Sequence, residues 1–284
     1  MDFFLSVFLL AAVGFLIGIF SGLLGIGGGT VMVPAFRLIF GMSALASTAT
    51  SLFVIIPTSL SGAITRIHQK TCIFSLGVAA GLGGALTSAL GVWLAAHSPS
   101  WLVMVVAAAV IAYSALNMFT KAFKLKGEGA VAGLDGESAV GDAGTGESAA
   151  GVAGAGDGVT KKQLLWGFAI GFVAGLVAGY VGVGGGFLMI PLMISILGLS
   201  MKDASGTSLV AMIILVIPAV IEQAFLGNID FIAGVVVVAG SVPGAIVGAH
   251  FVKRIPERAL RFVFSGFLLV AAALLALNEL SLFG

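Results

Sequence analysis

A glycine-rich motif occurs twice in the chain and carries its clearest chemical signal. The first copy reads GLLGIGGGTVMVP over residues 22–34, and the second reads GYVGVGGGFLMIP over residues 179–191. Four glycines in five positions cannot form a stable helix in lipid, because each costs about 1 kcal/mol relative to alanine and the backbone amides need partners. Glycine also leaves its N–H group uncovered, so such a run beside a helix start resembles the backbone nests that bind anions. The predicted ligand-contacting glycines are Gly25, Gly27, Gly28, Gly29, Gly182, Gly184, Gly185 and Gly186.

A packing role is the alternative interpretation of these glycines, because small residues let membrane helices approach closely. It stays open for the two runs of four. For Gly14, Gly18 and Gly22, which recur every four residues, it is the favoured interpretation.

Hydroxyl side chains follow each glycine motif at the start of the next predicted helix. Residues 47–51 read STATS and residues 204–208 read ASGTS. Hydroxyls in the first turns of a buried helix can donate to a small oxyanion, whose charge the helix dipole favours. Back-bonding to a carbonyl one turn earlier is the alternative, and it is common for Ser and Thr in membranes. The hydroxyl candidates present in both copies are Thr50, Ser51, Thr207 and Ser208.

Ionisable side chains inside predicted membrane helices are a third set of candidates, because each costs about 2.5–3.5 kcal/mol on insertion scales. Glu222 lies beside Gln223, and the positions 157 residues earlier hold Thr65 and Arg66, so the two copies differ there. Proton coupling or gating could use that difference, whereas snorkelling to the membrane surface is the alternative. The coupling or gating candidates are Glu222, Gln223, Arg66 and Arg37, of which Arg37 could offer its charge to an anion.

The motifs belong to a tandem duplication. An ungapped shift of 157 residues aligns residues 12–116 with residues 169–273. We therefore predict a first membrane repeat at 1–120 and a second at 163–284. Between them, a flexible cytoplasmic loop rich in Gly, Ala and acidic residues is predicted at 121–162.

The composition predicts a membrane protein. Apolar residues make up 60% of the chain and charged residues 9%, against roughly 25% charged in soluble domains. Each repeat is predicted to hold four full spanning helices plus one segment made of a glycine loop and a short helix. The predicted spanning helices cover residues 3–24, 43–65, 73–96, 101–120, 164–181, 200–225, 231–252 and 257–280. The predicted fold class is an all-α polytopic membrane protein, and Ser43 and Ser200 are predicted to cap their helices.

The orientation of the two repeats depends on whether residues 25–41 cross the membrane. If 25–33 are extended and Pro34 opens a short helix, the segment crosses, each repeat has five passes and the repeats are inverted. In that case 12 of the 13 Lys and Arg residues lie on one side, with only Arg37 opposite or embedded. If the segment does not cross, each repeat has four passes and the charges split nearly evenly. The positive-inside rule favours inverted repeats, with both termini outside.

Several function classes receive no support from the sequence. The net charge of +1 comes without a basic patch, so no nucleic-acid partner is predicted. Cys72 is the single cysteine and matches no metal-ligand spacing. With no catalytic triad or carboxylate pair, we predict no enzyme, no metal and no cofactor. The expected partners are the lipid bilayer, a small anionic substrate and a coupling proton or sodium ion, and a homo-oligomer stays open.

The doubled GxGGGxxxxP element resembles that of the sulfite exporter TauE/SafE family of membrane permeases. The element spans Gly25–Pro34 and Gly182–Pro191, each followed by a Ser/Thr-Ser-Leu helix start. The resemblance implies transport of sulfur oxyanions or organosulfonates, with both glycine loops and both prolines at the site. We therefore expect a multi-pass inner-membrane carrier of small sulfur-containing or organic anions that works by alternating access between the two loops. An anion or small-solute channel is the alternative, and a membrane enzyme or assembly subunit is less favoured.

Overall fold

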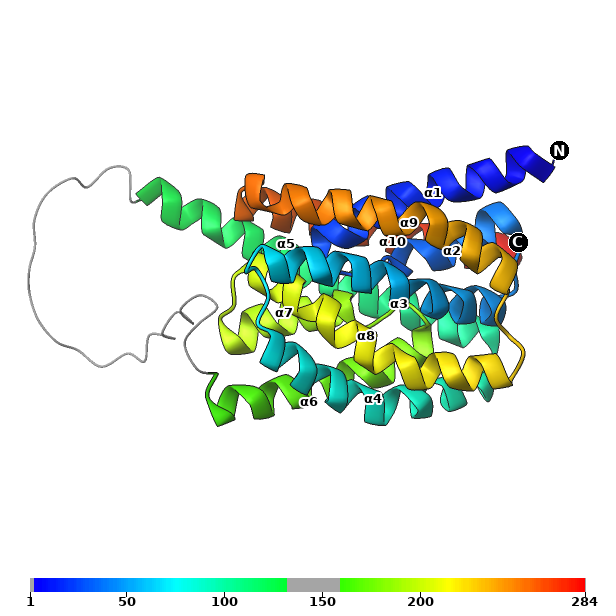
Figure 1. Ribbon diagram of the computed structural model, residues 1–284, viewed down its shortest axis with the longest axis horizontal. Helices are drawn as coiled ribbons and strands as arrows, with labels where there is room; N and C mark the ends of the chain where they lie inside the picture. The colour runs from blue at the N-terminus through cyan, green and yellow to red at the C-terminus, as the bar shows by residue number, and fades with distance from the viewer. Residues whose placement is uncertain (1–2, 132–158, 284) are drawn as a thin grey trace, which may run out of the picture.

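The computed structural model describes residues 3–131 and 159–283, and its regular elements there are helices without strands (Figure 1). The first five helices are α1 (Phe3–Leu24), α2 (Gly29–Phe40), α3 (Ala44–His68), α4 (Phe74–Ala96) and α5 (Ser100–Val131). The next five are α6 (Lys161–Val181), α7 (Gly186–Leu197), α8 (Met201–Phe225), α9 (Phe231–Phe251) and α10 (Glu257–Phe283), with a short 3₁₀ turn, η1 (Val252–Arg254), before α10. Helix α5 continues beyond residue 120, and the rest of the loop predicted at 121–162 falls mainly on residues 132–158, outside the described residues.

Six helices in the described part of the chain are long and apolar enough to cross a membrane. They are α3, α4, the Trp101–Thr120 part of α5, α6, α8 and the Phe231–Arg254 segment of α9 and η1. The outward face of α4 carries Leu82, Leu86 and Leu90, each more than half exposed. Apolar side chains on the outside of a helix bundle are typical of a lipid-facing surface. The protein is therefore a multi-pass helical membrane protein.

The predicted caps of the two long helices after the glycine motifs are confirmed. The Ser43 side chain accepts a hydrogen bond from the Ala46 amide at 3.2 Å, and the Ser200 side chain accepts one from the Asp203 amide at 3.1 Å. Each cap satisfies one backbone donor that the first turn leaves without a partner. These caps separate α3 and α8 from the short helices before them.

The short helices begin earlier than the sequence suggested. The expectation that residues 25–33 are extended and that Pro34 opens the helix is wrong. Helix α2 begins at Gly29 because the Gly28 carbonyl already accepts from the Met32 amide at 3.1 Å, and Pro34 lies inside it. Helix α7 begins in the same way at Gly186, with Pro191 inside it.

Helix α2 returns toward the end of the molecule where α1 begins. A Cβ atom built on Gly28 would lie 3.0 Å from Ile17 and Met32, so α2 folds back along α1. The loop after α1 is the turn of a hairpin, and Gly41 leads directly into α3. Twelve residues at 1.5 Å each give α2 a length of about 18 Å, which is too short to cross a membrane. The expectation that a segment which does not cross gives parallel repeats does not hold for a hairpin, because its return leaves α3 beginning at the end where α1 begins, as two crossings would (Figure 1).

The corresponding helices α3 and α8 run antiparallel. Arg66 near the end of α3 bonds Ser205 near the start of α8, whereas Thr50 near the start of α3 bonds the Asp230 amide just after α8. In Figure 1 the ends of α3 and α9 and the start of α6 lie together on the left. We call this the basic end, because it carries Lys70, Lys161, Lys162, Lys202, Lys253, Arg254 and Arg258.

Close packing by glycine joins α1 to α9 and α6 to α4, and it confirms the packing role predicted for Gly14, Gly18 and Gly22. A Cβ atom on any of these three would collide with the backbone of α9 at Val237, Ser241 or Ala245. The same relation holds for α6, where Gly171, Gly175 and Gly179 meet α4 at Ala80, Gly84 and Ser88. Both interfaces therefore depend on direct backbone contact between segments far apart in the sequence.

Candidate functional site

Each glycine loop is a tight turn that needs left-handed backbone. Gly25 and Gly27 of the first loop have φ values of 75° and 70°, and their counterparts Gly182 and Gly184 have 72° and 75°. Residues other than glycine rarely adopt such values, because a Cβ atom would clash with the chain. The two loops differ at one corresponding pair, because Gly28 is left-handed with a φ of 80° whereas Gly185 has a φ of −69°.

The two loops lie against one another inside the protein. All residues of 25–29 and 182–186 are buried. A Cβ atom on Gly29 would collide with the Val183 carbonyl, and one on Gly186 would lie 2.8 Å from the Gly25 carbonyl oxygen. The structure thus brings together the eight glycines that the sequence singled out.

The loops present backbone donors that have no acceptor. Within the described residues, the N–H groups of residues 26–29 and 183–186 make no hydrogen bond, whereas the flanking Gly25 and Gly182 amides bond the carbonyls of Ser21 and Ala178 at 2.8 Å. Buried backbone N–H groups are almost always paired. Unpaired ones at the start of a helix form a positive site, because the helix dipole adds to the N–H charge. The arrangement can therefore bind an anion.

The predicted serines hold the loops in place across the two halves. Ser208 of α8 donates to the Gly25 carbonyl at 2.7 Å, and Ser51 of α3 donates to the Gly182 carbonyl. Each serine thus bonds the first glycine of the other half's loop. Each hydroxyl also lies 2.9 Å from the carbonyl three residues earlier, of Thr48 or Ser205, so its single proton is engaged by backbone oxygens of its own helix and of the loop.

The predicted threonines satisfy backbone amides at the starts of other helices. Thr50 accepts from the Asp230 amide before α9, and Thr207 accepts from the Ile73 amide before α4, both at 3.0 Å. In this structure the four predicted hydroxyls therefore position the loops and the neighbouring helices. The donors that remain free are the loop amides.

Two apolar side chains pack against both loops, and the sequence analysis did not identify them. Ile55 and Met212 are fully buried at the midpoints of α3 and α8 and are related by the shift of 157 residues. A Cβ atom on Gly27 would lie 2.8 Å from Met212 Sδ, and one on Gly184 would lie 2.8 Å from Ile55 Cδ1. Only the repeat register could have suggested them, because neither side chain has polar chemistry.

Comparison with known sequences identifies the family. The sequence model of the family described as sulfite exporter TauE/SafE matches residues 10–275. This chain belongs to the TauE/SafE family. Among its relatives in Bacillus subtilis (strain 168), it is 28% identical to the probable membrane transporter protein YdhB, covering 89% of this chain and 93% of YdhB. It is 24% identical to the probable membrane transporter protein YunE, covering 90% of this chain and 92% of YunE. No solved structure matches the chain significantly.

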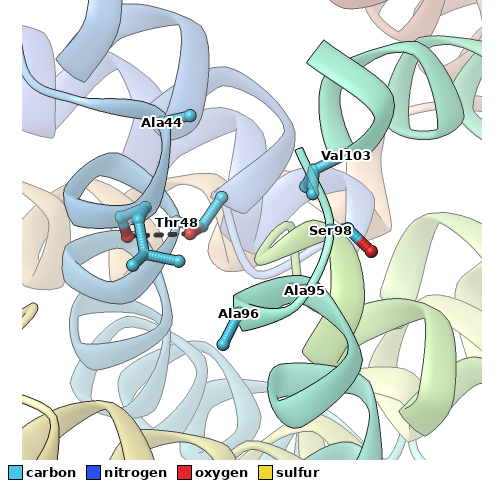
Figure 2. Close-up of a pocket in the computed structure, with 7 residues that line it drawn as sticks. Ala44, Thr48, Ala95, Ala96, Ser98 and Val103 are labelled. Carbon is cyan, nitrogen blue, oxygen red and sulfur yellow. Dashed lines mark hydrogen bonds between the residues drawn. The ribbon is translucent and has the colours of Figure 1, made fainter. Parts of the chain in front are cut away.

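At the end of this TauE/SafE protein opposite the basic end, a pocket of about 110 Å³ leads toward the second loop. Figure 2 shows Thr48 on one side of the pocket and Ala95, Ala96, Ser98 and Val103 on the other. Gly182 packs directly against Thr48. The volume is enough for several water molecules.

At the basic end, an arginine engages the counterpart of Thr48. That counterpart is Ser205, and it accepts a hydrogen bond from the Arg66 guanidinium. Arg66 also donates to the Leu23 carbonyl at 3.3 Å and is fully buried. The surroundings of Thr48 and Ser205 therefore differ, although the basic end of this TauE/SafE protein has a pocket of its own beside His68, His250 and Lys253.

The other coupling candidates lie apart from the loops. Glu222 is half-buried one turn before the end of α8, and the adjacent Gln223 is buried with its Oε1 accepting from Asn228 at 2.8 Å. Arg37 is half-buried in the last turn of α2. Of the four candidates only Arg66 lies beside a glycine loop. In the described part of the chain, no three His, Cys, Asp or Glu side chains gather as a metal site would need.

Proposed function

We propose that this protein is a secondary membrane transporter for small sulfur-containing or organic anions, of the sulfite and organosulfonate class. The observation that carries the proposal is the meeting of two buried glycine loops whose amide groups lack acceptors. Those donors suit an anion and not a cation. The family description and the names of the relatives support the same function.

We further propose that the chain consists of two inverted repeats in the cell membrane, with the basic end in the cytoplasm. The antiparallel course of α3 and α8 supports inversion, and the gathering of Lys and Arg at one end supports the orientation. The hairpins α1–α2 and α6–α7 would then enter from opposite sides. Discontinuous helices that meet near the membrane midplane are typical of carriers built from inverted repeats.

Alternating access would follow if contacts between the two repeats broke at one end of the protein while contacts between them formed at the other end. The pocket beside Thr48 at one end and the Arg66–Ser205 contact at the other support this scheme, in which such contacts would break and form in turn. Ile55 and Met212 pack against glycines of both loops, and the flexible Met212 side chain can move without backbone rearrangement. A coupling proton or sodium ion fits this scheme, with Glu222 as the residue to test.

The test is uptake of radiolabelled sulfite by purified protein in liposomes, with Gly185→Ala and Gly185→Leu as variants. Gly185 suits the test because its φ of −69° accepts any residue, and a Cβ atom there would lie 3.2 Å from Ala174. The matched control is Gly266→Ala, where a Cβ atom would meet nothing within 4 Å. We expect saturable uptake with counterflow in the wild type and control, reduced uptake with alanine, and none with leucine.

Gel filtration and thermal unfolding establish that each variant is folded. Full uptake by a folded Gly185→Leu variant would contradict the glycine site. Uptake that does not saturate and shows no counterflow would indicate a channel. Absence of uptake for sulfite, sulfoacetate, taurine and simple carboxylates in the wild type would contradict the proposed substrate class.

A further inference from the structure

The two glycine loops differ in the side chains around them. Ser21 and Thr30 flank the first loop, and both are fully buried with hydroxyl oxygens that have no hydrogen-bond partner. The residues 157 positions later are Ala178 and Phe187, which have no polar atom in the side chain. Leaving a buried hydroxyl unpaired costs about 1–3 kcal/mol. The duplication thus carries this cost at these two positions of the first half, where the second half has no hydroxyl.

Both hydroxyl-bearing residues adjoin the unpaired amides of the first loop. A Cβ atom on Gly28 would lie 3.5 Å from the Ser21 Cβ atom, so the Ser21 side chain faces the loop. Thr30 follows Gly29 as the second residue of α2. The four unpaired N–H groups of residues 26–29 therefore lie beside the Ser21 side chain and directly precede Thr30, and the hydroxyls of both residues are unpaired.

A positive charge also adjoins the first loop alone. Arg66 is the only fully buried charged side chain among the described residues, and no carboxylate there lies within ion-pair distance of it. Its acceptors are the neutral oxygens of Leu23, Ser205 and Thr71, and its Nε atom has none. The corresponding residue of the second half is the neutral Gln223, which is paired with Asn228.

We propose that the first glycine loop makes the main contacts with the anion and that the second loop contributes less. Ser21 and Thr30 are direct hydrogen-bond donors to the anion, and the positive charge of Arg66 compensates its negative charge. This inference rests on the proposed function and adds to it which residues select the substrate. The second loop keeps its unpaired amides, but Ala178 and Phe187 at the corresponding positions add no side-chain donor to them.

The chemistry of the donors defines the ligand class. Amide N–H groups cannot bind a cation, and a guanidinium repels one, so the site fits an anion. Several donors converging from one loop suit an oxyanion with two or three acceptor oxygens, such as sulfite or a sulfonate. Hydrogen bonds to a charged ligand are each worth more than neutral ones, so loss of one donor should be measurable.

The experiment measures the half-saturating sulfite concentration for uptake by Ser21→Ala, Thr30→Val, Thr30→Ser and Arg66→Gln. We expect Ser21→Ala and Thr30→Val each to raise that concentration about tenfold or more, and Thr30→Ser to restore it. Arg66→Gln places in the first half the residue that the second half has, and it should abolish saturable uptake. The controls are Ser114→Ala, which removes another buried unpaired hydroxyl, and Arg258→Gln, which removes an exposed charge at the same end.

The outcomes separate this inference from the function on which it rests. If wild-type uptake is normal and folded Ser21→Ala, Thr30→Val and Arg66→Gln variants transport as the controls do, the first-loop site is wrong and the transporter stands. An equal effect of Thr30→Ser and Thr30→Val would also contradict a donor role for Thr30. If the wild type takes up no tested anion, both proposals fail together.

Discussion

Replacing Gly175 by alanine tests whether direct backbone contact between α6 and α4 stabilises the protein. A Cβ atom at residue 175 would lie 2.6 Å from the Gly84 carbonyl carbon, where ordinary contacts are 3.4–4 Å. The helices must therefore separate by about 1 Å, because a backbone atom cannot rotate away. Overpacking of this kind costs about 1–3 kcal/mol. Alanine also favours a helix by up to about 1 kcal/mol over glycine, which opposes part of that loss.

Gly266→Ala isolates the steric contribution, because it carries the same helix propensity gain in open space. We expect Gly175→Ala to be less stable than Gly266→Ala by about 1–3 kcal/mol, since the propensity gain cancels in the comparison. Thermal unfolding of the purified proteins in one detergent measures the difference, at about 2–4 °C for each kcal/mol. Equal melting temperatures for the two variants would refute the argument that α6 and α4 are held by backbone contact.

Two further predictions concern single side chains. Ser208→Ala should lower the free energy of unfolding by about 0.6–2 kcal/mol, because the Gly25 carbonyl loses its donor in an apolar interior. Ser51→Ala should have the same effect through the Gly182 carbonyl. Thermal unfolding measures both variants, and an unchanged midpoint in both would mean that the loops keep their shape without these bonds. Burial raises the pKa of the Cys72 thiol to about 11, so the thiolate fraction at pH 7 is far below that of a free cysteine. N-ethylmaleimide should therefore label Cys72 about a hundredfold more slowly in the native protein than in the denatured chain. The labelling rate of the native protein should rise about tenfold per pH unit between 7 and 9. A labelling rate that does not depend on pH would contradict the raised pKa.

The sequence predicted those elements whose signals are local. Apolar length predicts the long helices, and the serines that cap α3 and α8 stand where a polar residue precedes an apolar run. The four-residue spacing of Gly14, Gly18 and Gly22 predicts a close helix contact because such residues lie on one face. The sequence predicted the start of α2 at Pro34, but the helix begins at Gly29, because the Gly28 carbonyl already accepts a helical hydrogen bond. Pro34 is tolerated inside the helix.

The partners of each element could not be predicted, because they lie far away in the sequence. Nothing in α3 indicates that Ser51 bonds Gly182, 131 residues away. The interpretation of the hydroxyls as open ligand donors also lacked this information, since the structure engages all four with backbone groups. Ser21 and Thr30 escaped notice for a different reason. The repeat does not mark them, because their counterparts Ala178 and Phe187 have no hydroxyl.

That difference bears on how a duplicated carrier can bind a single substrate. Two loops of identical chemistry would compete for the anion with equal affinity, and neither orientation of the carrier would be favoured by binding. The features shared by both halves here maintain shape, namely the left-handed glycines, the Ser51 and Ser208 bonds and the glycine faces of α1 and α6. Both loops also leave amides unpaired, and the features present in one half add unpaired hydroxyls or charge to them, as at Ser21, Thr30 and Arg66. In the proposed first-loop site, these departures from symmetry are the residues through which binding energy would favour one state over the other.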